Sequence, residues 1–420
     1  MEQVAPQTFR LRAWQHCAIL LLACAIIISR QPDAVFHAQF YAEDGHVWYA
    51  DAYNLGWWTA LFRVFEGYIE VFPRLGAALA LLVPLSAAPL VLNLVAIMVR
   101  ALPVSLLLSD RSSVWGTLAH RALMAGIYLT LPNTAELNAN ITNSQWLLAL
   151  TAFLILAGSK LHSIWEQIFD LLVLLLCALS GPFCIFLLPI AAFLSWKHRE
   201  RRYWLAVGVF ATGSFVQVWG LIHGGYAGRS HGPLGASLST VLKLFATQFY
   251  IGTLLGPNKL AIYAGASLNA MIFVIAVGGA ILTVLCLLKT DLEYRLLFVF
   301  SAMVVAGGLK SPLINEKMAP WAAMTVGAAA RYWFFPCLWL SWSVLHFLRS
   351  EIRFLRVVSS LFLCLLCFGI VLRWRIPALP DSNFAESAKR FDRAPSGTDM
   401  TFPVTPPGWN VRLVKHADSR

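Results

Sequence analysis

The sequence predicts an all-α integral membrane protein with about 11 transmembrane helices, an odd number. Of its 420 residues, 59% are hydrophobic and 13% are charged, and the mean hydropathy is +0.67. A soluble protein of this length cannot bury so much apolar surface, whereas lipid accepts it on the outside of a helical bundle. Apolar runs of roughly 18–25 residues recur along the chain, and a helix of that length crosses about 30 Å of hydrocarbon.

The placement of charges and cysteines fits a membrane protein better than a nucleic-acid-binding protein. The formal net charge is +11, but Lys and Arg fall in short clusters between apolar runs, where the positive-inside rule and anionic headgroups explain them. We therefore expect membrane lipids as partners and no nucleic acid. All eight cysteines lie in apolar segments, where thiols behave as small hydrophobic groups, so no disulfide framework is predicted.

The first apolar run, residues 13–29, follows two arginines. It lacks a small-residue cleavage site, so we predict an uncleaved first span with a cytoplasmic N-terminus. Residues 30–71 then form a first outer loop that holds six of the 21 acidic residues. Two short helices in this loop, near 46–54 and 57–65, are rich in aromatic side chains and are expected to lie in the headgroup layer.

Prolines and a basic cluster divide the rest of the chain. The apolar stretch 72–108 is too long for one span and is divided near 86–88. The stretch 169–196 is either one kinked helix or two short helices that turn at Gly181-Pro182. Within a multi-span domain 1–372 we expect further spans near 118–133, 145–158, 204–222, 267–288, 296–309, 330–348 and 357–372, a cytoplasmic cluster at 197–202, an interfacial segment at 237–255, and an outer appendage formed by the tail 373–420.

The acidic pair Glu43 and Asp44 is the strongest candidate for chemistry. Adjacent carboxylates at an outer membrane surface can supply a general base, because neighbouring charge and partial burial raise one pKa toward the working range. The alternative is that Asp44 merely caps the helix that begins at Gly45. We weigh these interpretations about equally, and we interpret Asp51 as a solvated charge.

Basic residues near the predicted outer ends of spans form a second group of candidates. Arg74 and Arg331 each begin a span, and they could either reach the headgroups or bind a phosphate that lies in the same plane. Lys310 precedes the loop before Arg331 and is a weaker candidate of the same kind. Arg229 and His231 lie in a glycine-rich outer loop, a kind of loop that often contacts substrate.

The passage 132–146 is unusually rich in amides for a segment between apolar runs. Asn143 and Gln145 could hydrogen-bond sugar hydroxyls, with Trp146 as a stacking platform. The alternative is a polar seam between helices, which we weigh slightly higher. The sequence contains no phosphate-binding glycine loop, no HExxH motif and no recognisable Ser-His-Asp arrangement, and no metal site is indicated.

Three motifs resemble the GT-C superfamily, polytopic glycosyltransferases that use sugars linked to polyprenyl phosphate. The stretch Tyr41-Ala42-Glu43-Asp44-Gly45-His46-Val47-Trp48-Tyr49-Ala50 is similar to the acidic motif in the first outer loop of that superfamily. Ser180-Gly181-Pro182-Phe183 with Leu187-Leu188-Pro189 resembles a recurring helix start, which favours two short helices there. Arg331-Tyr332 with Pro336 resembles a later bacterial signature. The resemblance covers the topology of most of the chain.

The resemblance implies an inverting glycosyltransferase at the outer face of a bacterial inner membrane. Asp44 or Glu43 would deprotonate an acceptor hydroxyl on a cell-envelope glycan or lipid, and Arg74 and Arg331 would neutralise the departing lipid phosphate. A second acidic motif of the kind found in metal-dependent oligosaccharyltransferases is missing, which weakens a metal requirement. The competing hypotheses are a transporter or flippase, and a polymerase or ligase, of lipid-linked glycans.

Overall fold

The computed structural model describes residues 11–159, 163–224, 233–263, 265–314 and 318–416. Within these ranges the chain is mostly helical, and its strands form two separate two-stranded hairpins. Seven helices are long and apolar enough to cross a membrane, and three shorter helices are also apolar. These are features of an all-α, multi-pass membrane protein, while the figure of about 11 spans stays a prediction.

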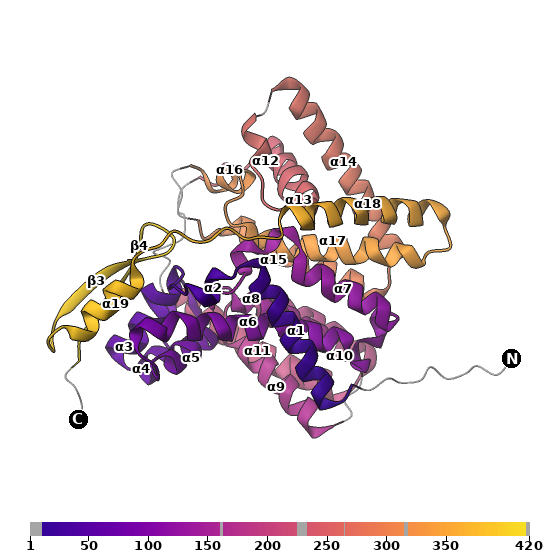
Figure 1. Ribbon diagram of the computed structural model, residues 1–420. Coiled ribbons are helices and arrows are strands. Elements are labelled where there is room, and N and C mark those ends of the chain that lie inside the picture. Colours follow the sequence, from indigo (N-terminus) through magenta and orange to yellow (C-terminus); the bar gives the residue numbers. More distant parts are fainter. Residues whose placement is uncertain (1–10, 160–162, 225–232, 264, 315–317, 417–420) are drawn as a thin grey trace.

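The elements are labelled as in Figure 1. The α-helices are α1 (Ala13–Arg30), α2 (Asp33–Phe36), α3 (Ala50–Leu55), α4 (Trp57–Leu61), α5 (Val71–Ala80), α6 (Ala88–Leu108), α7 (Leu118–Thr130), α8 (Ser144–Ala157), α9 (Ile164–Ala178), α10 (Phe183–His198), α11 (Arg201–His223), α12 (Leu238–Lys243), α13 (Gly252–Leu255), α14 (Ala266–Lys289), α15 (Leu292–Lys310), α16 (Pro320–Thr325), α17 (Phe334–His346), α18 (Arg353–Leu372) and α19 (Phe384–Arg393). The strands are β1 (Val64–Phe65), β2 (Tyr68–Ile69), β3 (Asp399–Val404) and β4 (Trp409–Val414), and π-helical or 3-10 turns include η1 (Asp44–Tyr49), η2 (Leu85–Ala87), η4 (Pro132–Leu137), η5 (Leu244–Ile251) and η7 (Ala330–Trp333).

Two ambiguous stretches of the sequence each fold as two elements. The short turn η2 separates α5 from α6 at the position predicted for residues 86–88. The stretch 169–196 contains two helices, α9 and α10, which turn at Gly181 with φ of +82°. A side chain at Gly181 would strain this backbone and would also overlap Gln145, whose Oε1 atom is 1.9 Å from the ideal Cβ position. The segment 238–255, expected to be interfacial, is long and apolar enough to cross a membrane.

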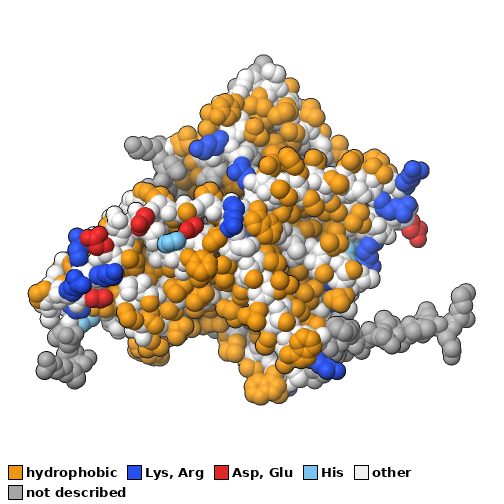
Figure 2. Space-filling model, in the orientation of Figure 1, with side chains coloured by type: hydrophobic (Ala, Val, Ile, Leu, Met, Phe, Trp, Pro, Cys, Tyr) orange, Lys and Arg blue, Asp and Glu red, His pale blue; other side chains and the backbone are white. Residues whose placement is uncertain are grey.

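The interior of the bundle is aromatic, and its outer surface is apolar. The side chains of α8 and α17 are buried almost throughout. The indole Nε1 of Trp339 donates to the carbonyl oxygen of Tyr294 at 2.9 Å, and that of Trp342 donates to Met124 at 3.0 Å. Helix α18 instead exposes large apolar side chains such as Val371, which is 75% exposed. Figure 2 shows hydrophobic side chains over most of the visible face, as lipid contact requires.

Arg30 holds together the C-terminal ends of α1, α7 and α18. Its guanidinium is 1% exposed and donates to the carbonyl oxygens of Leu129 at 2.8 Å and Trp374 at 3.3 Å, and to the Thr134 hydroxyl at 2.7 Å. The carbonyl groups at the end of a helix lack partners within the helix, and Arg30 supplies one for α7. The first loop and the C-terminal tail therefore leave the bundle at the same end.

The first loop begins with the short helix α2 and continues with a helical stretch made of η1 and α3, which α4 follows. Helix α4 ends at Leu61, so the helix predicted for 57–65 is too long. Residues 64–69 instead form the hairpin β1–β2, in which Val64 lies opposite Ile69. Its two turn residues, Glu66 and Gly67, have φ of +50° and +85°. Positive φ at both positions is the geometry of a tight two-residue hairpin turn.

The C-terminal tail folds as α19 and the hairpin β3–β4 against the first loop, where Figure 1 shows it beside α3. Phe384 is buried, and its ring centroid is 5.0 Å from that of Phe40. The backbone amide of Thr405 donates to the Phe40 carbonyl oxygen at 3.1 Å, and the Asn410 carbonyl oxygen lies 2.6 Å from Nδ1 of His46. The appendage thus packs directly on the segment that carries the acidic pair.

Candidate functional site

Asp44 is a buried residue of the first loop, and its side chain is hydrogen-bonded to the loop that precedes α8. Its carboxylate accepts hydrogen bonds from the Thr142 amide at 2.9 Å, the Thr142 hydroxyl at 2.5 Å and the Ile141 amide at 3.3 Å. The residue is 1% exposed, and no side chain caps the start of η1. The helix-cap interpretation of Asp44 is therefore wrong. Burial raises the pKa of Asp44 to about 7, although the hydrogen bonds from Thr142 and Ile141 oppose the shift.

Glu43 is only partly buried, in contrast to its neighbour Asp44. Its carboxylate forms no hydrogen bond with another residue in the described ranges, and the nearby charges are those of Arg331, Glu136 and His46. Burial raises the pKa of Glu43, while its own backbone amide and Arg331 lower it and Glu136 raises it further. Glu43 is therefore the more exposed member of the acidic pair.

Arg331 and Glu136 form an ion pair beside Glu43, and each side chain is 21% exposed. The Arg331 backbone amide donates to Oε2 of Glu136 at 2.9 Å, and its guanidinium binds Oε1. A second guanidinium nitrogen donates to the Leu313 carbonyl oxygen at 2.9 Å. Burial opposes the charge on Arg331, but Glu136 outweighs this effect and raises its pKa. The fold thus brings residues from three distant segments together at Glu43.

The amide-rich loop is mostly hydrogen-bonded to itself. Oδ1 of Asn140 accepts from both the backbone amide and the side-chain amide of Asn143 at 3.0 Å. The side-chain amides of Asn140 and Asn143 each donate to the Glu136 carbonyl oxygen at 2.9 Å. Asn143 is 5% exposed. This arrangement favours the polar-seam interpretation, because the loop holds Glu136 and the Thr142 donors in place rather than presenting its amides to solvent.

Trp146 and Gln145 face different surroundings. Trp146 is 5% exposed, stacks on Phe335 at 5.7 Å and meets the edge of Phe183 at 4.8 Å. It is a core residue, so the predicted stacking platform for a sugar is not present in this conformation. Gln145 is partly exposed and hydrogen-bonds the carboxyl group of Glu70. Gln145 therefore stays a candidate for sugar or acceptor binding.

Arg74 is a residue of α5 that is buried against the first loop rather than exposed at the headgroup surface. Its side chain is 1% exposed, it is 3.0 Å from Asp51, and its guanidinium carbon is 5.0 Å from the Trp48 ring centroid. Asp51 also pairs with Arg63 at 2.7 Å. The expectation that Asp51 is simply solvated is wrong, because it links two arginines. Both arginines are paired with an acid, but the Arg74 side chain is 1% exposed and that of Arg331 is 21% exposed, so Arg74 is the poorer candidate for a phosphate ligand.

Glu70 is a further candidate site residue that was not predicted from the sequence. It is 4% exposed, and its Oε2 atom is buried without a hydrogen-bond partner among the described residues. Burial raises the pKa of Glu70 to about 8, Arg74 lowers it, and Glu43 raises it. The sequence does place Glu70 directly before the apolar run that forms α5, and an acid at that position could have been considered a candidate. The close packing of Gln145 and Gly181 around the carboxyl could not be read from the sequence.

The stability of the protein should depend on pH through Glu70. The folded-state pKa of about 8 exceeds the ordinary value of 4.5, so the folded protein holds this proton more tightly than the unfolded chain. Stability should fall by up to about 1.4 kcal/mol per pH unit as the pH rises between these values. We expect thermal unfolding of Glu70→Gln, measured from pH 5 to 8.5, to show a shallower decline than that of wild type.

The exposed residue Glu386 supplies the matched control for this measurement. Glu386→Gln removes an identical carboxyl from the surface of α19 and should leave the pH profile of the wild type unchanged. Parallel profiles for wild type and Glu70→Gln would show that Glu70 carries no shifted proton.

The remaining predicted site residues lie in two places. Lys310 is exposed at the end of α15, three residues before Leu313, whose amide donates to the Tyr332 hydroxyl at 3.1 Å. Arg229 and His231 lie outside the described residues. Within the described ranges, no group of three or more His, Cys, Asp or Glu side chains is arranged to hold a metal ion.

Comparisons of the whole chain with known proteins add no family assignment. A scan of protein-family models and a search of curated proteins both found no match.

Proposed function

We propose that this protein is an inverting glycosyltransferase that moves a sugar from a polyprenyl-phosphate carrier to a cell-envelope glycan or lipid. The observation that carries the proposal is the partly exposed Glu43, which lies beside the charges of Arg331 and Glu136 and forms no hydrogen bond with another described residue through its carboxylate. It lies in the first loop, at the end of the bundle where the apolar helix α1 stops. A lipid-linked donor confined to the bilayer presents its phosphate and sugar at such a boundary.

Glu43 is better suited than Asp44 to act as the general base. A base must come within hydrogen-bond reach of the hydroxyl that it deprotonates. Both carboxylate oxygens of Asp44 already accept hydrogen bonds from Thr142 and Ile141, and the residue is buried. We assign Glu43 the chemical role and Asp44 the role of a positioning residue that holds the acidic motif on the loop before α8.

The proposed reaction is a single displacement at the anomeric carbon of the sugar. The acceptor hydroxyl gives its proton to the Glu43 carboxylate, and its oxygen forms the new bond to the anomeric carbon. The bond from that carbon to the phosphate oxygen breaks, and its electron pair leaves with the lipid phosphate. Attack opposite the leaving group inverts the configuration of the sugar. A raised pKa makes Glu43 a stronger base than an ordinary carboxylate.

Arg331 is the strongest candidate to stabilise the leaving phosphate, with Lys310 as a second cation. Arg331 is partly exposed, and its guanidinium holds the Leu313 carbonyl of the segment that follows Lys310. Positive groups directed at the developing phosphate charge stabilise the transition state more than the ground state. Arg74, paired with Asp51, would act indirectly by fixing the first loop.

A donor panel tests the proposal. The purified wild-type protein, given undecaprenyl-phosphate sugars and cell-envelope lipids or glycans as acceptors, should release undecaprenyl phosphate from at least one donor. The sugar should appear on the acceptor with inverted configuration. Absence of release from every donor, together with protein-dependent movement of lipid-linked glycans across proteoliposomes, would instead identify a transporter. Formation of long glycans from pyrophosphate-linked donors would identify a polymerase or ligase.

A further inference from the structure

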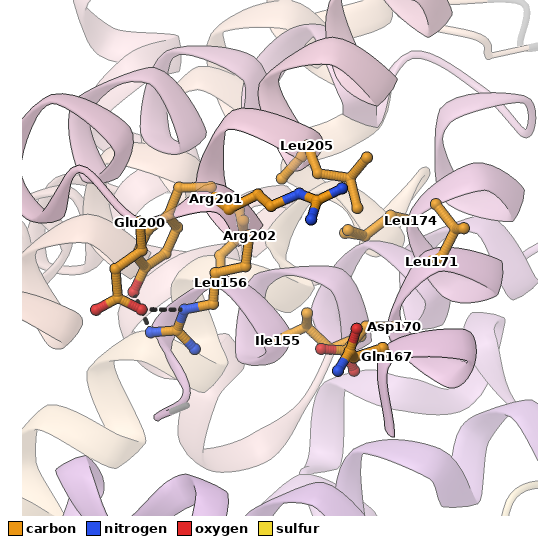
Figure 3. Close-up of a pocket in the computed structure, with 12 residues that line it drawn as sticks. Ile155, Leu156, Gln167, Asp170, Leu171, Leu174, Glu200, Arg201, Arg202 and Leu205 are labelled. Atoms are coloured by element: carbon orange, nitrogen blue, oxygen red, sulfur yellow. Dashed lines mark hydrogen bonds and ion pairs between the residues drawn. The ribbon is translucent and has the colours of Figure 1, made fainter. Parts of the chain in front are cut away.

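A second candidate binding site lies between the ends of α8, α9 and α11, away from the first loop. The cavity there has a volume of about 430 Å³. Its walls are mainly apolar and include Ile155, Leu171, Leu174 and Leu205. Figure 3 shows these side chains around the cavity, with the guanidinium of Arg201 extended toward Leu205. The cavity therefore combines a hydrocarbon lining with a cation at its edge.

The other charged groups around the cavity are paired within the protein. Arg111 binds Asp170 through two hydrogen bonds, of 2.9 and 2.6 Å. Arg202 lies 3.2 Å from Glu200 and donates to the carbonyl oxygens that precede α9. Arg201 is exposed and forms no hydrogen bond or ion pair with any residue that the structure describes. One positive charge at the edge of the cavity is thus left without compensation.

We propose that this cavity binds an anionic phospholipid, with the phosphate on Arg201 and an acyl chain along the leucines of α9 and α11. Charge complementarity selects the head group, because the basic cluster 197–202 contains four Lys and Arg residues and a single acid. The apolar walls select a lipid rather than a free anion, since a hydrated phosphate ion gains nothing from contact with Leu171 or Leu174. Under the positive-inside rule this end of the bundle faces the cytoplasmic leaflet, where anionic lipids are enriched.

Lipid titration of the detergent-purified full chain, followed by native mass spectrometry, tests this site. Phosphatidylglycerol should bind more tightly than phosphatidylcholine with the same acyl chains. Arg201→Gln should weaken phosphatidylglycerol binding by about fivefold. Leu171→Trp, which fills the cavity without changing its charge, should weaken the same binding independently.

The control is Lys197→Gln, which removes an exposed positive charge of the same cluster that does not line the cavity. It should leave phosphatidylglycerol affinity unchanged. Equal binding of the two lipids, or equal weakening by Lys197→Gln, would overturn the proposal in favour of diffuse attraction. Full competition by inorganic phosphate would instead show a site for a free anion. None of these readouts depends on sugar transfer.

Discussion

Replacing Glu43 with glutamine is expected to lower sugar transfer by about 100-fold or more while the protein stays folded. A positioned general base contributes about 10²–10⁴ to a rate, and glutamine keeps the size of the side chain while losing the ability to accept a proton. Glu43 forms no hydrogen bond with another described residue, so its loss should not disturb the packing of the loop. The turnover number at saturating donor, measured beside the unfolding temperature, checks this prediction.

Asp33→Asn is the matched control for Glu43→Gln. It neutralises another acid of the first loop, which lies just after the C-terminal end of α1. The Asp33 side chain is 43% exposed and pairs only with His37 among the contacts described, so transfer should be unchanged. Wild-type turnover in Glu43→Gln would remove Glu43 from the mechanism. Equal losses in both variants would indicate a general effect of loop charge instead.

Replacing Asp44 with alanine is expected to destabilise the protein by about 3 kcal/mol. The substitution leaves the Thr142 and Ile141 amides without their acceptor in a buried position, and a buried donor without a partner costs about 1–3 kcal/mol. Reversible unfolding in mixed micelles would measure the change. Sugar transfer should fall as well, because the segment that holds Glu43 would lose its attachment.

Thr142→Val tests the positioning role of Asp44, because it removes one hydrogen-bond partner of the Asp44 carboxylate. Valine removes the hydroxyl that donates to Asp44 and accepts from the Trp48 indole at 2.9 Å, but it keeps the backbone amides. We expect a smaller destabilisation than in Asp44→Ala, and less than additive effects in the double variant because the two residues share a hydrogen bond. Asp44→Ala with wild-type stability but no transfer would make Asp44 the base and contradict the assignment to Glu43.

Much of the fold follows from apolar periodicity and from punctuation by glycine and proline. The division between α5 and α6 lies between Pro84 and Pro89. The turn between α9 and α10 contains Gly181, whose positive φ is easily adopted by glycine. The hairpin at Glu66-Gly67 was missed, because two-residue strands carry almost no alternation to detect. The aromatic content of 57–65 then favoured a helix that was four residues too long.

The candidate site was predicted in part. The sequence indicated Glu43, Asp44 and Arg331, since acids and bases are scarce in such an apolar chain. Long-range pairing then decided what each residue does. Asp44 is bound to Thr142 in another segment, and Arg74 is neutralised by Asp51 across the loop. These contacts join residues that are far apart in the sequence, and no residue pattern indicates them. The sequence therefore could not show which acids and arginines are buried and which are exposed.

Carboxylate labelling tests the central claim most directly. Treating the purified protein with a water-soluble carbodiimide and an amine nucleophile, then locating the modified residues by mass spectrometry, should label Glu43 but not the buried Asp44. Adding the donor that supports transfer should protect Glu43. Labelling of Asp44 with Glu43 untouched, or labelling of Glu43 that no donor diminishes, would contradict the placement of the reactive base at Glu43.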